Sequence, residues 1–322
     1  MFDRKGGAAA VRGRPEPADP VTGAGGQPAA DHARHRWIAR LTPWLFLAVP
    51  LAFLVTFTYV PVSDLLYFSL TKWDGFSPDK QFVGAANYVQ LFTRSDLFRV
   101  FFVCLFYLAA AVVQVALSLY FATVLSFNVR FRNFFKGVLF FPYLINGVAI
   151  GFIFLYFFQP GGTLDSVLRL LGVHGQHLWL GDPDLVNWSL AGVSVWRYTG
   201  LSFVLFLGAI QSIPGELYEA ASIDGATRWH QFRHLMLPGI RPTLSLTVIL
   251  CISGSLGVFE IPYIMTGGAN GSTTFVIQAI KLAFQFNKVG LASAAAVVLL
   301  GLVLLVTWLQ RRIAPDERVG AL

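Results

Sequence analysis

Residues 100–127 read VFFVCLFYLAAAVVQVALSLYFATVLSF, a run of 28 residues without one charged side chain. A helix needs about 20 apolar residues to cross a hydrocarbon core of roughly 30 Å. Inside lipid every backbone N–H and C=O must be paired within the segment or barrel, and a membrane barrel would show shorter, alternating strands. The run therefore predicts a transmembrane helix.

Five more apolar runs of similar length accompany it. They cover residues 43–70, 137–158, 188–213, 243–266 and 290–310. Pro50 and Pro61 interrupt the first run, which predicts a kink or an earlier end there, because proline lacks the N–H that an interior helical position requires. The sequence thus predicts an all-α integral membrane protein with six transmembrane helices.

The composition supports this class and excludes others. Of the 322 residues, 55% are hydrophobic and only 13% are charged, and the mean hydropathy is +0.62. Soluble domains carry about 25% charged residues. These values exclude a soluble enzyme, a disordered chain and a typical nucleic-acid binder. The net charge of +7 points to a lipid bilayer rather than nucleic acid, because the basic residues gather at the ends of the apolar runs.

The distribution of Lys and Arg predicts domain boundaries and orientation. Residues 1–42, rich in Gly, Ala, Pro and Arg, are expected to form a disordered cytoplasmic tail, 43–312 the transmembrane domain and 313–322 a second cytoplasmic tail. With the N-terminus inside, 16 of the 24 basic residues lie on the cytoplasmic side and seven outside. The positive-inside rule therefore predicts that both termini face the cytoplasm.

The connection between the fourth and fifth runs, 211–242, reads QSIPGELYEAASIDGATRWHQFRHLMLPGIRP and predicts two short helices. Pro214 suits the first turn of the first helix, where Glu216 and Glu219 complement the positive helix end. Asp224-Gly225 then interrupts the pattern: Gly225 permits a turn, and Asp224 is expected to cap the second helix.

That second helix, 226–235, carries one apolar stripe, and Pro238 is expected to end it. The stripe consists of Trp229, Phe232 and Leu235 or Met236. Helices this short are marginal alone, so either the membrane helices or a partner protein must pack against them.

The spacing within this connection resembles a known family motif. Glu219-Ala220-Ala221, three residues, Gly225, nine residues, Leu235 and then Leu237-Pro238 resemble the EAA motif of permease subunits in binding-protein-dependent ABC importers. The chain departs from the motif at Leu235, where the family usually has Ile, a change that keeps an apolar side chain of equal size.

Two weaker features extend the resemblance to the sugar-uptake (maltose-type) permeases over about 44–312. Gly84-Ala85-Ala86-Asn87-Tyr88 resembles the family's G-x-x-N-Y, and Thr266-Gly267-Gly268 resembles its T-G-G turn. The family often continues the turn with Pro, whereas this chain has Ala269-Asn270.

The resemblance implies a multi-pass permease subunit in a bacterial cell membrane. Its partners would be a second homologous permease, a dimer of ATP-binding cassette ATPases and an extracytoplasmic sugar-binding protein. The loop 214–242 would be the coupling element that docks on the ATPase; the alternative is a self-packed cytoplasmic cap. The implied coupling residues are Glu219, Ala220, Ala221, Asp224, Gly225, Leu237 and Pro238.

No Walker A pattern, H-E-x-x-H or other zinc spacing occurs in the sequence. The chain is therefore expected to bind no cofactor or metal and to catalyse no reaction. ATP and Mg²⁺ would be bound by the partner ATPase.

A sugar pathway needs polar groups within the membrane, where they are costly. Ser194, Arg197 or Tyr198, and Leu201 or Ser202 share one face of the fourth helix. The fifth offers Ser253, Ser255 and Glu260. In the resembling family the helices flanking the coupling loop line the pathway.

Each of these residues has a structural alternative. Arg197 can pair with Glu260 or a partner subunit, and serines often bond backbone carbonyls. Gln114 and Asn146 could equally form interhelical hydrogen bonds.

Two rival functions remain at this point. An ion-gradient-driven secondary transporter would show inverted repeats and suitable intramembrane acids, and neither is evident. An intramembrane enzyme would need catalytic pairs that the sequence does not offer.

Overall fold

The computed structural model describes residues 29–127, 130–175 and 177–313, with side chains from residue 42 to residue 312 within those ranges. The chain forms two compact units, Met1–Val60 and Pro61–Leu322. Each unit is described by itself.

The first unit is helical from Ala29 onward. It contains α1 (Ala29–Leu54) and the π-helical turn η1 (Val55–Tyr59), and helix α2 (Val60–Ser69) continues into the second unit. The predicted interruption is local, because the wide π turn lies just before Pro61 and loosens the hydrogen-bond ladder where proline offers no N–H. Helix α1 begins inside the segment assigned to a disordered tail, of which residues 1–28 lie outside the described residues.

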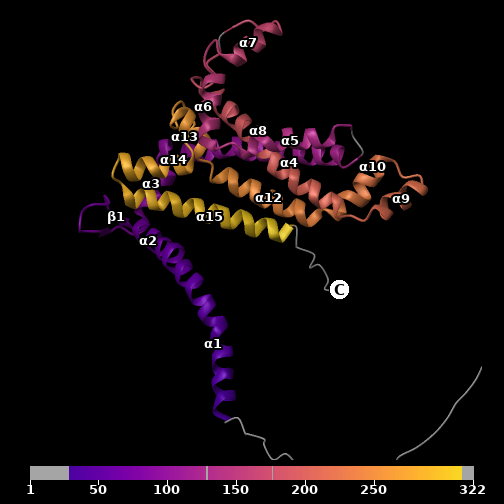
Figure 1. The fold of residues 1–322 in the computed structure, drawn as a ribbon. Coiled ribbons are helices and arrows are strands. Elements are labelled where there is room, and N and C mark those ends of the chain that lie inside the picture. Colours follow the sequence, from indigo (N-terminus) through magenta and orange to yellow (C-terminus); the bar gives the residue numbers. More distant parts are fainter. Residues whose placement is uncertain (1–28, 128–129, 176, 314–322) are drawn as a thin grey trace, which may run out of the picture. The chain divides into compact units, whose positions relative to one another are not determined.

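Four long helices build the second unit. They are α4 (Ser95–Ser126), α8 (Val186–Gln211), α12 (Arg241–Leu256) and α15 (Val289–Ile313). Helix α4 packs against α8 and α12, and α12 also packs against α15, so these helices lie side by side (Figure 1). Their bounds agree with the predicted second, fourth, fifth and sixth runs within a few residues, apart from a break in the fifth.

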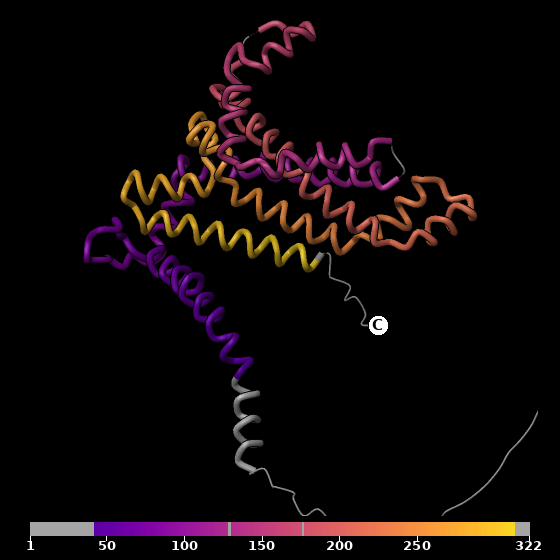
Figure 2. The backbone as a smooth tube through the Cα atoms, in the orientation of Figure 1, coloured from indigo at the N-terminus to yellow at the C-terminus, as the bar shows by residue number. Residues whose placement is uncertain are grey.

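The third predicted run, 137–158, does not form one continuous helix, so that part of the prediction was wrong. The chain forms α5 (Arg132–Leu144) and α6 (Gly147–Phe157), bent by 98° (Figure 2). Ile145 and Asn146 are extended, and the Asn146 side chain accepts a hydrogen bond from the Val148 N–H at 2.8 Å. An N-cap begins a new helix, so the local polar chemistry overrides the apolar run. The interhelical role considered for Asn146 is therefore replaced by this cap.

The fifth predicted run also has a break near its end. Helix α12 stops at Leu256, and α13 (Glu260–Thr266) starts after three residues. Gly267 ends α13 with φ +59°, and Gly268 follows at φ +76°. In the T-G-G stretch, helix α13 thus ends with two glycines in the left-handed backbone conformation, which glycine adopts without steric cost.

Beyond this turn, α14 (Phe275–Ile280) and the π turn η3 (Lys281–Gln285) lead into α15. Among the described residues, five helices are long and apolar enough to cross a membrane, or up to six if the bent α5–α6 pair counts as one span.

A small hairpin departs from the all-helical expectation. Strands β1 (Thr71–Lys72) and β2 (Gln81–Phe82) pair antiparallel before α3 (Ala86–Thr93). Asn87 donates from Nδ2 to the carbonyl oxygens of Ser69 and Thr71 at 2.8 and 2.9 Å. The G-x-x-N-Y stretch therefore fastens α3 to the end of α2 and the start of the hairpin.

Helix α7 (Thr163–Leu170), which follows α6, contains a buried carboxylate. Asp165 accepts hydrogen bonds from Trp179 Nε1 at 2.8 Å and from the Gly161 N–H at 2.7 Å. These bonds hold the pKa of Asp165 below its usual value.

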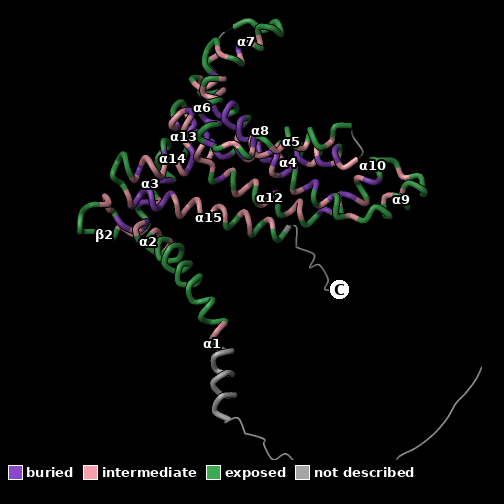
Figure 3. Tube along the Cα trace, in the orientation of Figure 1, coloured by how far each residue is buried: buried purple, intermediate pink, exposed green. Residues whose placement is uncertain are grey.

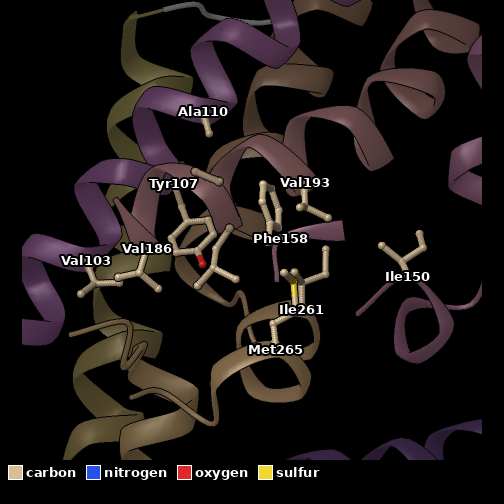
Figure 4. Packing of buried hydrophobic residues seen from close by; sticks show 11 residues of the cluster. Val103, Tyr107, Ala110, Ile150, Phe158, Val186, Val193, Ile261 and Met265 are labelled. Carbon is tan, nitrogen blue, oxygen red and sulfur yellow. The ribbon is translucent and has the colours of Figure 1, made fainter. Parts of the chain in front are cut away.

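The buried residues follow the contacts between helices (Figure 3). One core cluster joins Val103 and Tyr107 of α4, Ile150 of α6, Val193 of α8 and Ile261 of α13 (Figure 4). Because α6 and α13 meet in this cluster, the two helices that follow the breaks both pack against α4 and α8.

Candidate functional site

The connection between α8 and α12 contains the predicted helical pair. Its elements are α9 (Gly215–Ile223), α10 (Arg228–Gln231), the π turn η2 (Phe232–Met236) and α11 (Leu237–Gly239). It lies at the opposite end of α8 and α12 from α13 and α14 (Figure 1).

Gly225 forms the turn between the two helical parts. It has φ +78°, its N–H bonds the Ser222 carbonyl at 3.1 Å, and the Ala226 N–H bonds the Ala221 carbonyl at 2.9 Å. This pair of bonds is the Schellman motif, in which the residue after the helix C-cap takes a left-handed conformation. The predicted glycine turn is confirmed.

Two details of the predicted loop were wrong. Asp224 is the C-cap residue of α9, and the N-cap of α10 is Thr227, whose side chain accepts from the His230 N–H. Pro238 does not stop the second helix, because the wide π turn before it accommodates a residue without an N–H. The chain instead turns at Ile240 and continues as α12.

One side of the loop packs on its own bundle. Phe232 and the buried Met236 and Ile240 join a core cluster with Phe203 and Phe206 of α8. Burial in this region also raises the pKa of Tyr218. This side matches the self-packed alternative.

The other side carries most of the motif and remains exposed. Glu219, Ala220, Asp224, Gly225 and Pro238 are exposed, whereas Ala221 and Leu237 are half-buried. Ile223 is 87% exposed and Trp229 is 64% exposed. Large apolar side chains that stand in solvent beside a motif suit a protein contact.

A second site lies between the long helices. A cavity of about 590 Å³ is lined by α4, α5, α8, α12, α13 and the break before α13. Such a volume falls within the range of small-molecule sites. Its walls bring together five of the predicted pathway residues: Ser194, Tyr198, Ser202, Ser255 and Glu260.

Two predicted pathway residues, Arg197 and Ser253, do not belong to the cavity wall. Arg197 Nη1 instead donates to Glu260 Oε2 at 2.8 Å, and its guanidinium lies over the Tyr198 ring at 5.1 Å. Of the alternatives considered for Arg197, the structure shows the pairing with Glu260. The Arg197 side chain is only 11% exposed, whereas that of Glu260 is 41% exposed.

The ion pair lies where the break before α6 meets the break before α13. Glu260 is the first residue of α13, and Gly147 is the first residue of α6. A Cβ atom built on Gly147 would overlap the Glu260 carboxylate and Arg197 Nη1. Only glycine therefore lets the α6 backbone approach the pair this closely.

Gln114 is the residue for which an interhelical hydrogen bond was an equal alternative to a pathway role. Its Nε2 donates to the Tyr198 carbonyl, Ser202 Oγ and Cys251 Sγ at 3.3, 3.0 and 3.3 Å. The interhelical hydrogen bond is thus confirmed, and Gln114 also lines the cavity. Its position as a lone amide in the 28-residue apolar run was the available signal.

Other wall residues gave no signal of this kind. Tyr107, Tyr143, Thr247 and Phe259 line the cavity from four different segments, and only the packing of those segments brings them together. In the described part of the chain, no group of three His, Cys, Asp or Glu side chains could hold a metal ion.

The family model and the similar proteins identify the same family. Residues 114–319 match the family described as "Binding-protein-dependent transport system inner membrane component". The chain is 34% identical to the "Probable ABC transporter permease protein YurN" of Bacillus subtilis, over 85% of this chain and 96% of the relative. It is also 34% identical to the "Diacetylchitobiose uptake system permease protein NgcF" of Streptomyces coelicolor, over 89% of this chain and 84% of that relative.

A solved structure shares the fold. It is that of a bacterial alginate ABC transporter in complex with a periplasmic protein bound to an alginate pentasaccharide. One of its chains matches with a TM-score of 0.75 and 22% identity, over 87% of this chain and 98% of that chain.

Proposed function

This chain belongs to the family of inner membrane components of binding-protein-dependent transport systems, and we propose that it carries a sugar together with a second, similar permease. It is a multi-pass ABC importer permease rather than an enzyme. The sugar would be an oligosaccharide or amino sugar handed over by an extracytoplasmic binding protein. The relative named for diacetylchitobiose uptake supports this choice of cargo.

The cavity between α4, α8 and α12 is the observation that carries the sugar proposal. It combines aromatic faces with hydroxyl, amide and carboxylate groups, as a polyhydroxylated ligand requires. We assign Ser194, Tyr198, Ser202, Ser255 and Glu260 to direct contact with the cargo. Arg197 acts behind them through Glu260, and Ser253 stays a predicted pathway residue without a place in this wall.

The loop 214–242 is proposed to couple transport to ATP hydrolysis in a separate ATPase dimer, which would bind ATP and Mg²⁺. The exposed apolar side chains of Ile223 and Trp229, next to the exposed Glu219 and Gly225, support this role. The packed side of the loop supports it too, because a lever must be attached to the helices it moves.

For the orientation we propose that the loop and both termini face the cytoplasm, with six spans in which the bent pair α5–α6 counts as one. The distribution of basic residues supports this arrangement. The segments 1–42 and 313–322 would flank the permease domain on that side.

Co-purification tests the coupling proposal. Membranes are solubilised, the tagged chain is captured, and the ATP-binding cassette subunit is quantified for the native chain and for Glu219→Lys. The charge reversal is expected to reduce the captured ATPase at least about tenfold, because it adds charge repulsion and an unpaired charge to the contact. Sugar uptake that continues without any ATPase would contradict the proposal.

Arg197→Ala tests the cavity separately from the loop. We expect sugar uptake to fall while ATPase capture stays at the native level, because Arg197 lies in the Glu260 pair and not in the loop. Unchanged uptake and sugar preference would remove Arg197 from the transport mechanism.

A further inference from the structure

The cavity wall carries an uneven charge. Of its residues, Glu260 is the one acid, and no Lys or Arg is among them. The basic partner Arg197 lies behind the wall and is nearly buried, whereas the Glu260 side chain is 41% exposed. The ion pair therefore presents its negative end to the cavity.

The hydrogen bonds of the neutral wall groups add to this bias. The hydroxyls of Ser194, Thr247 and Ser255 donate to backbone carbonyls of Leu190, Thr243 and Cys251 at 3.1, 2.7 and 2.7 Å. A hydroxyl whose hydrogen is already donated can offer only its lone pairs to a ligand.

The amide of Gln114 follows the same rule. Its Nε2 is directed to α8 and α12, which leaves its carbonyl oxygen for a ligand. The phenol groups of Tyr143 and Tyr198 can donate or accept. Ser202 Oγ accepts from Gln114 and can donate its own hydrogen. The wall therefore offers a ligand acceptors and neutral donors but no Lys or Arg.

The pair is also held in this orientation. The backbone at Gly147 closes over Arg197 and Glu260, and the Tyr198 ring lies under the guanidinium. Because both neighbours are part of packed helices, Arg197 is kept from turning toward the cavity to meet an anion.

We infer that this cavity accepts uncharged, hydroxyl- or amide-rich saccharides and rejects anionic ones such as uronates and sugar phosphates. The inference rests on the proposed function and narrows its cargo. A neutral sugar supplies O–H and N–H donors to the acceptors of the wall, whereas a carboxylate or phosphate supplies only acceptors and meets the Glu260 charge where no Lys or Arg lines the wall.

Cys251 offers a native reporter of the charge, because it lines the cavity close to Ser202. The full-length chain in native membranes is treated with a cationic trimethylammonium-ethyl or an anionic sulfonatoethyl methanethiosulfonate. Modification of Cys251 is followed by mass spectrometry, and each rate is divided by that of the same reagent with a free thiol. The buried Cys104 is the internal control.

We expect the normalised cation-to-anion ratio at Cys251 to exceed one and to fall about fivefold in Glu260→Gln, as removal of a nearby unit charge predicts. Arg197→Gln should raise the ratio. Asp184→Asn, which removes a carboxylate from an exposed loop, is the matched control and should leave it unchanged. A native ratio at or below one, or no change in Glu260→Gln, would overturn the inference.

Glu260→Gln leaves Arg197 without its partner, so the double variant Arg197→Gln/Glu260→Gln is measured as well. It removes both charges and should give a ratio between that of Glu260→Gln and that of the native chain. A ratio that stays at the native value in the double variant would equally overturn the inference.

A transport assay keeps the two proposals apart. Uptake of diacetylchitobiose, other neutral oligosaccharides, uronate disaccharides and sugar phosphates is compared between cells with and without the chain. We expect chain-dependent uptake of neutral saccharides alone. Chain-dependent uptake of an anionic saccharide would overturn the charge inference and leave the proposed function intact, whereas no chain-dependent uptake of any saccharide would overturn the proposed function.

Discussion

The cavity and the loop 214–242 share helices α8 and α12 but obtain their geometry in different ways. The loop depends on short-range bonds: the Gly225 turn is closed by contacts within five residues. The cavity depends on long-range ones: Arg197 and Glu260 are 63 residues apart, and Gln114 reaches residues 84 to 137 positions away. The loop can therefore be altered without the cavity, and each site can be tested separately.

The two regions also differ in what they leave uncovered. The loop exposes apolar side chains, which gain free energy when a protein surface covers them. The cavity wall is largely apolar too, but it also presents polar groups that can bond a ligand. This contrast supports the proposed protein partner at the loop and the proposed sugar at the cavity.

The largest expected effect is at the cavity, from Gly147→Ala. The new methyl group would overlap the Arg197–Glu260 pair, and overpacking of this kind costs about 1–3 kcal/mol. We expect a lower thermal midpoint of the detergent-solubilised chain and loss of most sugar uptake. Gly208→Ala, on α8 with open space at its Cβ, is the control and should behave like the native chain.

The next effect is at the loop, from Gly225→Val. A β-branched residue is strained at φ +78°, so the turn would change its angle. We expect transport to drop more than about tenfold while the amount in the membrane stays normal, since the cost of the left-handed conformation is about 1–2 kcal/mol. Uptake assays and membrane immunoblots measure the two quantities.

Gly225→Asn is the matched control, because asparagine tolerates the left-handed region better than other residues. It should retain transport. If Gly225→Val disappears from the membrane, the glycine serves folding rather than coupling.

A smaller effect is expected from Ile223→Ser, which removes an exposed apolar side chain from the loop. Loss of such a contact at a protein interface costs about 1 kcal/mol or more, so the captured ATPase should fall about fivefold without a change in thermal stability. Leu170→Ser on α7, which is 88% exposed, is the control. Equal loss of ATPase in both variants would show that the contact is not specific to the loop.

The smallest effect is expected outside both regions, at Asp165. Its pKa is lowered in the folded chain by hydrogen bonds from Trp179 and Gly161. The stabilisation is therefore fully present above the unfolded pKa of about 4 and is lost as the pH falls through the lower folded value.

Trp179 fluorescence, taken as the difference from Trp179→Phe, should show a step below pH about 4. In Asp165→Asn this acid step should be missing. An acid step that persists in Asp165→Asn would contradict the assignment.

The positions of the long helices followed from the sequence because their cause is local. An uncharged run of sufficient length must be helical in lipid wherever its neighbours lie, as residues 100–127 illustrate. The Gly225 turn followed for the same reason. The face shared by Ser194, Tyr198 and Ser202 also followed, since helical periodicity alone brings the three side chains to one side.

Where prediction failed, competing local bonds or distant contacts decided the outcome. Asn146 supplied a cap that outweighed the apolar character of 137–158, and the π turn before Pro238 removed the reason for a helix stop. Hydropathy averages over such single residues and cannot detect them.

The sequence by itself determined a helical membrane protein, its long spans and the helix–turn–helix between α8 and α12, because lipid, periodicity and glycine conformation act over a few turns. Only the tertiary structure decided which side of the Arg197–Glu260 pair faces the cavity, and why Gly147 must be glycine. Those features arise where two helix breaks from distant parts of the chain meet, and the energy of an ion pair depends on the atoms packed around it.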